Sequence, residues 1–383
     1  MKSVKKRVGI ITYYYFYNYG TMLQAFALCE AINAKYNVEC ELIDYRFAEK
    51  TIIDKKTLFK IRLKRISYYL FNINKVLIQL LYRNRLSRRK LFFDNFAKAI
   101  PHSHNRYEYE DELYLNPPEY DIYITGSDQT WSPKIGLFGV LFLDFVKNRA
   151  CKAAYAPSIG VSSLQEMESD YISTMLKGYD YISCREKIGA NILQGLTSKP
   201  VINVLDPTFL INNEKWAAIS KRPDGAPEES YILCYFLGDR SYCRKYVNEL
   251  SKQRGISVYY VPVSYADCKR RNNLLYDVGP KEFLYLINNA EIVCTDSFHG
   301  MALSINMNKN FYGFVKHKGE ISGGDNSRIY DLLKRFGLEN RLVYETESRP
   351  EISDSIDYAK VNSLIKTELE VSYSFIDGII GNV

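Results

Sequence analysis

Residues 291–306 read Glu291-Ile-Val-Cys-Thr-Asp-Ser-Phe-His-Gly-Met-Ala-Leu-Ser-Ile-Asn306 and predict a strand, a turn and the start of a helix. In open α/β sheets, ligands bind at such a strand-to-helix edge. The N–H groups at the helix N-terminus favour an anion there. His299, in the turn, can add a proton or a hydrogen bond. Taken alone, the segment is equally consistent with a polar helix cap and a packed histidine.

The rest of the chain repeats the alternation of strand and helix. Apolar runs predict strands at 8–14, 38–45, 120–125, 151–156, 181–184, 201–205, 231–237, 257–263, 291–295 and 311–315. Helical spacing of apolar residues predicts helices at 21–36, 164–177, 188–194, 242–254, 280–288 and 327–336. This rhythm predicts an α/β fold with mostly parallel sheets.

The length of 383 residues favours two domains over one core. A polar stretch with Pro and Gly, 221–229, interrupts the alternation, and we place the boundary there. We expect an N-terminal Rossmann-like domain over 1–220 and a C-terminal one over 221–345, facing each other across a cleft. A helical tail over 346–383 could pack back on the N-terminal domain.

Composition points to a soluble globular protein, with 46% hydrophobic and 25% charged residues. The eight cysteines are scattered singly, which predicts neither a zinc site nor a disulfide framework and favours the cytoplasm. The longest apolar stretch, 66–82, contains polar residues and is a poor membrane span. The 33 tyrosines weakly favour a carbohydrate partner.

Residues 51–100 carry a net charge of about +11, in a chain whose total net charge is +7. The apolar residues of this segment recur at helical spacing, which predicts basic amphipathic helices. One interpretation is a solvated helix face over the core. The other is attraction to an anionic partner, either a membrane surface at the inner face or a pyrophosphate-bearing substrate. Nucleic acid is disfavoured because no binding motif accompanies the charge.

Four loops at expected strand ends carry reactive side chains. Asn18-Tyr-Gly20 is either a ligand-binding turn or a plain one. Ser127 and Asp128 precede Trp131, which suits a sugar, although an acid cap beside a core Trp is equally consistent. Arg185 follows another strand, where it binds an anion or pairs with Glu186. The fourth loop is basic and spans 316–328.

Several segments together resemble the polysaccharide pyruvyl transferase family. They are Gly9-Ile-Ile-Thr12, Asn18-Tyr-Gly-Thr-Met-Leu-Gln-Ala25, Gly126-Ser-Asp-Gln-Thr-Trp131, Ala154-Tyr-Ala-Pro-Ser-Ile-Gly160, Ser183-Cys-Arg-Glu186, Leu205-Asp-Pro-Thr208 and Ser297-Phe-His-Gly300. The resemblance spans roughly residues 8–335. It implies a two-domain fold similar to the GT-B glycosyltransferases, and transfer of pyruvate from phosphoenolpyruvate to two sugar hydroxyls as a cyclic ketal.

The resemblance also implies roles for individual residues. His299 and Asp128 are the expected catalytic residues, as general acid and as base or hydroxyl acceptor. Donor binding is expected from Arg185 of the N-terminal domain and from Ser297, His299, Gly300, Lys316 and Arg328 of the C-terminal domain, the expected donor side. Acceptor binding on the N-terminal side is expected from Asn18, Tyr19, Gly20, Gln24, Ser127, Asp128 and Trp131. Some members carry Arg-Leu-His where this chain has Ser297-Phe-His299, so another cation must meet the donor's charge.

The expected co-substrate is phosphoenolpyruvate, with a sugar or lipid-linked oligosaccharide as acceptor in bacterial-type surface polysaccharide biosynthesis. No cofactor or metal is expected, and His102 with His104 is a weak candidate for a metal pair. Two alternatives stay open. One is a GT-B-like glycosyltransferase that uses a nucleotide sugar, and the other is a non-catalytic glycan-binding or assembly protein.

Overall fold

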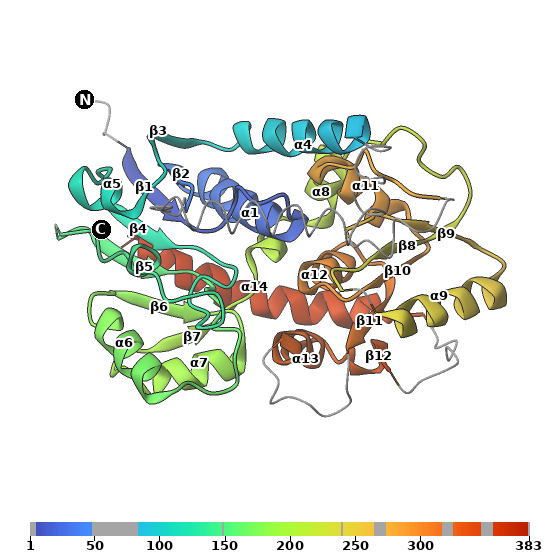
Figure 1. Ribbon diagram of the computed structural model, residues 1–383. Coiled ribbons are helices and arrows are strands. Elements are labelled where there is room, and N and C mark those ends of the chain that lie inside the picture. Colours follow the sequence, from blue (N-terminus) through green and yellow to red (C-terminus); the bar gives the residue numbers. More distant parts are fainter. Residues whose placement is uncertain are drawn as a thin grey trace, which may run out of the picture.

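A computed structural model describes residues 5–47, 83–147, 149–238, 240–263, 273–315, 325–345 and 355–381. The chain forms two α/β units that lie beside each other, and each is built on a parallel β-sheet (Figure 1). The predicted fold class, two Rossmann-like α/β units with parallel sheets, is therefore confirmed.

The first unit contains a seven-stranded sheet in the order β3-β2-β1-β4-β5-β6-β7, and every neighbouring pair is parallel. Its strands are β1 (Lys6–Ile11), β2 (Val38–Tyr45), β3 (His102–Tyr107), β4 (Ile122–Thr125), β5 (Cys151–Ala154), β6 (Tyr181–Cys184) and β7 (Val201–Asn203). Its helices are α1 (Tyr19–Lys35), α4 (Arg83–Lys98), α5 (Glu110–Leu115), the 3-10 helix η1 (Gly139–Phe142), α6 (Glu166–Leu176) and α7 (Lys187–Gln194). Because the strands are parallel, their carboxyl ends share one edge of the sheet.

The second unit contains a five-stranded parallel sheet in the order β12-β11-β10-β8-β9. Its strands are β8 (Tyr231–Tyr235), β9 (Ser257–Tyr260), β10 (Ile292–Thr295), β11 (Asn310–Val315) and β12 (Leu342–Tyr344). Its helices are α9 (Ser241–Arg254), α11 (Pro280–Asn289), α12 (Phe298–Asn306), α13 (Asp325–Arg335) and the 3-10 helix η4 (Glu339–Arg341). The 3-10 helix η2 (Pro207–Leu210) and α8 (Asn213–Ile219) lie between the two sheets in sequence, so the expected boundary near residue 220 falls between the sheets.

The C-terminal helix α14 (Tyr358–Gly381) runs back to the first unit (Figure 1). Asp377 pairs with the Lys35 ammonium at 3.0 Å and accepts a hydrogen bond from the Tyr36 hydroxyl at 2.6 Å. The Ser372 hydroxyl accepts from the Leu205 N–H at 2.9 Å. The last helix of the chain is thereby anchored to α1 and to the loop after β7.

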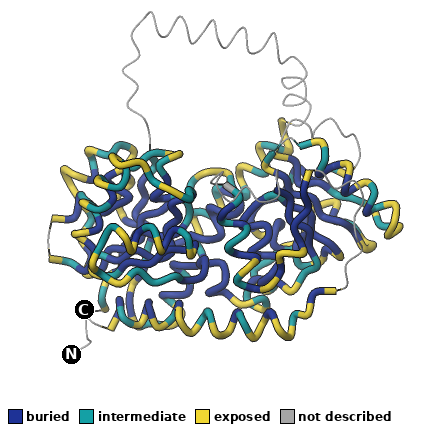
Figure 2. The backbone as a smooth tube through the Cα atoms, turned by 90° about the horizontal axis from the view of Figure 1, so that it is seen from below, coloured by how far each residue is buried: buried dark blue, intermediate teal, exposed yellow. Residues whose placement is uncertain are grey.

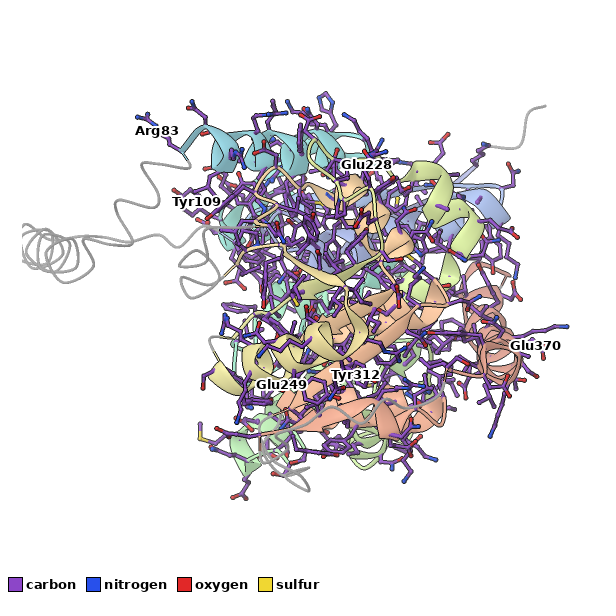
Figure 3. All side chains as sticks on the ribbon, turned by 90° about the vertical axis from the view of Figure 1, so that its right-hand side faces the viewer. Arg83, Tyr109, Glu228, Glu249, Tyr312 and Glu370 are labelled. Carbon is purple, nitrogen blue, oxygen red and sulfur yellow. The ribbon has the colours of Figure 1, made fainter. Side chains whose placement is uncertain are left out.

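Helix α4 extends from the first unit to the second. Phe93 and Phe96 are buried in the core that α4 shares with α1. Arg88 pairs with Asp224 at 2.7 Å and with Asp277 at 3.1 Å. In Figure 3, Arg83 projects from the exposed start of this helix. The described part of the predicted basic segment, 83–100, thus includes contacts between the units, and 51–82 lie outside the described residues.

The buried residues fill the interior of both units and the region between them (Figure 2). Two strands were not predicted, β12 (Leu342–Tyr344) and β3, which begins at His102. Its sequence, His102-Ser-His-Asn-Arg-Tyr107, lacks the apolar alternation of a half-buried strand. Pairing with β2 at one edge of the sheet makes it a strand, and this pairing is a tertiary effect.

Candidate functional site

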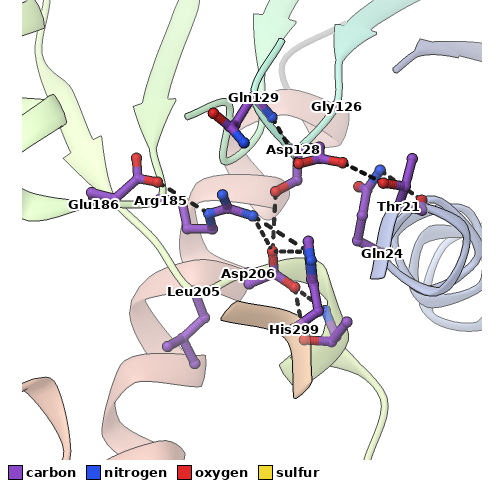
Figure 4. A network of polar contacts seen from close by, with 12 residues as sticks. Thr21, Gln24, Gly126, Asp128, Gln129, Arg185, Glu186, Leu205, Asp206 and His299 are labelled. Carbon is purple, nitrogen blue, oxygen red and sulfur yellow. Dashed lines mark hydrogen bonds and ion pairs between the residues drawn. The ribbon is translucent and has the colours of Figure 1, made fainter. Parts of the chain in front are cut away.

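The carboxyl-terminal edges of the two sheets meet, and polar side chains from both converge there (Figure 4). The first unit contributes Asp128 after β4, Arg185 after β6 and Asp206 after β7. The second unit contributes His299 from the first turn of α12. These residues lie 171 positions apart at most in sequence yet form one network, so the site belongs to the contact between the units.

Asp206 is the centre of the network. Its Oδ2 accepts from Arg185 Nη1 at 2.9 Å and from the Ser127 hydroxyl at 3.2 Å. His299 Nε2 lies 3.5 Å from the same oxygen and 3.5 Å from Arg185 Nη1. Oδ1 accepts from the N–H and the hydroxyl of Thr208, at 3.0 and 2.7 Å. Both oxygens are therefore engaged, as a buried carboxylate requires.

The network is closed to solvent, with exposures of 3% for Arg185, 2% for Asp206 and 7% for His299. Burial alone would raise the pKa of Asp206, but His299, Arg185 and the Thr208 hydrogen bond hold it well below its usual value. Burial likewise opposes the charge of Arg185, yet Glu186 and Asp206 keep its pKa above the usual value. Asp206 and Arg185 are therefore a buried ion pair at neutral pH.

His299 is positioned by the start of α12 and by a close approach of α1. The Ser297 hydroxyl accepts from the Gly300 N–H at 3.3 Å and caps the helix. A Cβ atom on Gly20 would lie 2.2 Å from His299 Nδ1, so only glycine leaves room for this ring. The imidazole is therefore held between the N-terminus of α1 and the Asp206 carboxylate.

Asp296 fixes the turn that precedes α12. Its carboxylate accepts from the N–H groups of Leu237 at 2.6 Å and Gly238 at 3.0 Å, and it pairs with Arg240 at 3.3 Å. Burial raises the pKa of this carboxyl despite those partners. The turn is thus joined to the loop after β8 from within the second unit.

Arg185 has one nitrogen that is not used. Its Nε donates to Glu186 at 3.3 Å, and the guanidinium carbon lies 4.1 Å from the centre of the Phe298 ring. Nη2 is buried and has no hydrogen-bond partner among the described residues. A small cavity of about 10 Å³, enough for about one water molecule, is lined by Arg185, Asp206, Phe298 and, from α13, Arg328. Arg185 and Arg328, two of the predicted donor residues, thus line the same cavity.

Asp128 lies at the edge of the network, half-buried. Its carboxylate accepts from the Thr21 hydroxyl at 2.8 Å and from the Gln129 N–H at 2.9 Å. Its backbone is left-handed, with φ of 76°, and that of Ala156 in the neighbouring loop is too, with φ of 56°. The two loops are joined where the Ser158 N–H donates to the Asp128 carbonyl at 2.8 Å. Left-handed backbone at non-glycine residues costs energy and is concentrated at functional sites.

The predicted acceptor residues divide into two groups. Asn18 caps α1, and Gly20 lies against His299. The Ser127 hydroxyl donates to Asp206. Gln24 donates to the Thr12 hydroxyl at 3.1 Å, and that hydroxyl in turn donates to the Ser127 carbonyl. These four lie at the network. Of the donor residues, Ser297 and Gly300 form the α12 cap, and Lys316 lies outside the described residues.

Two predicted acceptor residues are corrected by the structure. Trp131 is fully buried, stacks on Phe142 with ring centres 5.0 Å apart and donates its indole N–H to Leu141. Tyr19 is buried against Phe283, and its hydroxyl donates to the Val278 carbonyl. Neither ring has a face free for a sugar, because the core and the contact between the units cover them.

Asp206 is the main residue that was not assigned a role from the sequence. It stands in the quoted segment Leu205-Asp-Pro-Thr208, one of those that carry the family resemblance. An Asp followed by Pro and Thr directly after a strand is typical of a cap, and Asp206 does cap η2. Asp206 follows the carboxyl end of a predicted strand, where ligands bind in such sheets, and this position could have identified it as a candidate site residue.

In the parts of the chain that the structure describes, no group of three or more His, Cys, Asp or Glu side chains is placed to bind a metal ion. Within the same residues, none of the helices has the length and apolar character to cross a bilayer.

The fold and the site define a two-unit α/β protein with a buried charged network where the units meet. A sequence model of the polysaccharide pyruvyl transferase family matches residues 18–317, and the chain belongs to this family. The assignment supports pyruvyl transfer in polysaccharide biosynthesis and makes the protein a transferase. A comparison with curated proteins finds no match.

Several solved structures are similar to the chain. UDP-N-acetylglucosamine 2-epimerase from Rickettsia bellii is 10% identical, with a TM-score of 0.47 over 99% of both chains. The UDP-GlcNAc 2-epimerase of Methanocaldococcus jannaschii, in complex with UDP-GlcNAc and UDP, is 11% identical, with a TM-score of 0.45 over 96% of this chain and 93% of that one. Arabidopsis thaliana UGT89C1, complexed with quercetin, is 11% identical, with a TM-score of 0.39 over 99% of both chains.

Proposed function

We propose that the protein transfers pyruvate from phosphoenolpyruvate onto two hydroxyls of a sugar, as a cyclic ketal, during bacterial-type surface polysaccharide biosynthesis. The observation that carries the proposal is the meeting of Arg185 and His299 from opposite units at the Asp206 carboxylate. This arrangement combines a fixed cation with a proton carrier, which an enol phosphate donor needs.

The donor is bound by Arg185 and Arg328. Arg185 supplies the unused Nη2, and Arg328 lines the same cavity. These two cations would meet the donor's charge in a chain that has Ser297 where some members of the family carry an arginine. The cavity between them has room for about one water. Binding of phosphoenolpyruvate therefore requires the units to move apart and then to close on it. No cofactor or metal takes part in the proposed reaction.

The reaction needs a proton on one carbon and removal of protons from two hydroxyls. His299 delivers its proton to the methylene carbon as the first sugar oxygen bonds to the neighbouring carbon, and Asp128 takes the proton of that hydroxyl. Phosphate then leaves with the bonding electrons, and the second hydroxyl adds and gives its proton to the phosphate. The products are the ketal, which carries a methyl and a carboxylate group, and inorganic phosphate.

The test combines mass spectrometry with thermal shift. Candidate lipid-linked oligosaccharides incubated with phosphoenolpyruvate should gain a pyruvyl ketal and release phosphate. His299→Ala should reduce transfer by at least about a hundredfold while the protein stays folded, and His104→Ala, an exposed histidine on β3, should not reduce it. Near-normal transfer by His299→Ala would remove that residue from the mechanism.

Thermal shift distinguishes the donor class. Phosphoenolpyruvate should stabilise the protein, since a ligand of the folded state raises its melting temperature. Stabilisation by a nucleotide sugar alone would favour the glycosyltransferase alternative. Acceptor binding with no product from either donor would favour a glycan-binding role.

We further propose a cytoplasmic location, with peripheral contact between residues 51–100 and the anionic inner face of the membrane. The exposed Arg83, Arg85, Lys90 and Lys98 of α4 support attraction to such a surface. Flotation with phosphatidylglycerol vesicles at low and high salt tests this contact. If the protein stays in solution at low salt, the basic segment does not bind the membrane and is only a solvent-exposed helix face.

A further inference from the structure

Five aromatic residues of the first unit form a continuous cluster beside the site. The rings of Tyr15 and Phe16 are 4.3 Å apart between centroids, and Phe16 is 5.7 Å from Tyr13. Phe47 lies 4.9 Å from Tyr13 and 4.2 Å from Tyr45. The residues come from the loop after β1 and from the end of β2, two neighbouring strands of the sheet. We call Tyr13, Tyr15, Phe16, Tyr45 and Phe47 the aromatic cluster.

The outer member of the aromatic cluster is open to solvent. Phe16 is 47% exposed, whereas Tyr13 and Tyr45 are buried. Phe47 has a left-handed backbone, with φ of 53°, which is unusual for a bulky side chain. Its ring packs against Tyr13 and Tyr45. The cluster is therefore an ordered surface with an exposed ring, supported from beneath by buried ones.

The aromatic cluster is continuous with the reactive edge. The Tyr13 carbonyl accepts from Gln24 at 3.0 Å, and the preceding Thr12 donates its hydroxyl to the Ser127 carbonyl at 2.7 Å. Ser127 binds Asp206, and Asp128 is the next residue. The Tyr13 hydroxyl is buried and has no hydrogen-bond partner among the described residues. Burial and the Asp128 carboxylate both raise the pKa of Tyr13, so its hydroxyl keeps its proton at neutral pH and can donate a hydrogen bond.

Polar groups lie beside the rings. The Arg46 guanidinium lies 5.8 Å from the Tyr15 ring centre and 2.6 Å from the Asp44 carboxylate. Arg46 retains 29% side-chain exposure, so it can reach a ligand on the cluster. An aromatic face next to fixed charged donors and acceptors matches the two sides of a sugar, which has an apolar C–H face and a hydroxyl rim.

We propose that the aromatic cluster is a second acceptor subsite, on which a sugar ring next to the reacting one stacks against Phe16. The proposal rests on the proposed function, because it assumes that the acceptor is a glycan longer than one sugar. Stacking there holds the reacting sugar near Asp128, whose carboxylate lies close enough to Tyr13 to influence its hydroxyl. An alkyl chain of a lipid carrier is the competing occupant, and the variants below separate the two.

The experiment uses the full-length protein and three soluble probes, tetra-N-acetylchitotetraose, galactotetraose and maltotetraose, in calorimetric titrations. At least one should bind the wild type. Phe16→Ala should weaken that binding by up to about tenfold, from the size of an aromatic contact. Phe16→Trp keeps a π face and should bind like the wild type, whereas Phe16→Leu should be as weak as Phe16→Ala. Val371→Ala, an exposed apolar residue on α14, should bind normally.

Three outcomes would overturn the subsite. The wild type could bind none of the probes, or Phe16→Ala could bind as tightly as the wild type. Full binding by Phe16→Leu would also overturn it, because it indicates an apolar occupant. Stabilisation by phosphoenolpyruvate is measured on the same variants and should be unchanged, because the ring partners of Phe16 are Tyr13 and Tyr15, which are not donor residues. Glycan binding that depends on the aromatic ring, without any pyruvyl transfer, would retain the subsite and reject the proposed reaction.

Discussion

The Asp206 carboxylate contacts Arg185 and His299, which belong to different units. Its negative charge therefore offsets the positive charge of Arg185 within the site. Removing one partner of a buried ion pair is costly because the other charge stays buried. The pKa of Asp206 is lower in the folded protein than in the unfolded chain, so the folded state binds fewer protons in acid. Its stabilising effect is complete above the unfolded pKa of about 3.9 and is lost as the pH falls below it.

Asp206→Asn should therefore lower the free energy of unfolding at neutral pH by about 3 kcal/mol. As the pH falls below about 4, the loss of stability should be shallower than in the wild type, because the variant lacks one titrating carboxylate. Urea unfolding across this range measures both effects. Asp377→Asn, which breaks an exposed pair, should cost no more than about 1 kcal/mol. Identical acid profiles for Asp206→Asn and the wild type would contradict the ion-pair assignment.

At the scale of elements, α12 determines where His299 lies. The helix is buried from end to end and depends on the Ser297 hydroxyl at its N-terminus. Ser297→Ala should cost about 1 kcal/mol in stability, and because His299 lies in the same turn, it should also reduce activity. Asn212→Ala removes the cap of α8, which accepts from the Lys215 N–H at 2.9 Å, and serves as control.

Chemical unfolding and a transfer assay measure the two variants. Both should lose similar stability, but only Ser297→Ala should lose activity. If Asn212→Ala loses as much activity as Ser297→Ala, the effect is one of general stability rather than of the position of His299.

The sequence was most informative where local pattern and tertiary environment agree. The strand predicted at 291–295 is β10 (Ile292–Thr295), and the predicted turn and helix follow it directly. Arg185 and His299 each follow a strand end, as expected, but they belong to different sheets and meet because the two units present these edges to each other. The burial of the Trp131 ring could not be predicted from the local sequence. The ring is covered by Phe142 and Tyr179, and Tyr179 lies 48 positions away in the sequence. The polar strand β3 is likewise formed by its neighbour β2 and not by its own pattern.

At the scale of the molecule, α4 helps to hold the units together. Arg89 donates to the Tyr19 hydroxyl at 2.9 Å and to the Pro262 carbonyl at 2.7 Å, so it links α4, α1 and the end of the second sheet. Arg89→Ala should lower the free energy of unfolding by about 1–3 kcal/mol, since it leaves buried acceptors with fewer donors. Scanning calorimetry and limited proteolysis between the units measure the change. Arg85→Ala, exposed on the same helix, should behave like the wild type, and equal effects of both variants would argue against a specific link.

The division of the site between the two units has a kinetic consequence. His299 meets Arg185 and Asp206 only as often as the connecting segments allow, so those segments set an effective concentration of one half of the site at the other. A longer or looser connection near residue 220 would lower this effective concentration, roughly as the −3/2 power of its length, with every side chain of the site intact. The rate of the enzyme would then depend on the length of chain between its halves as much as on the chemistry of any residue.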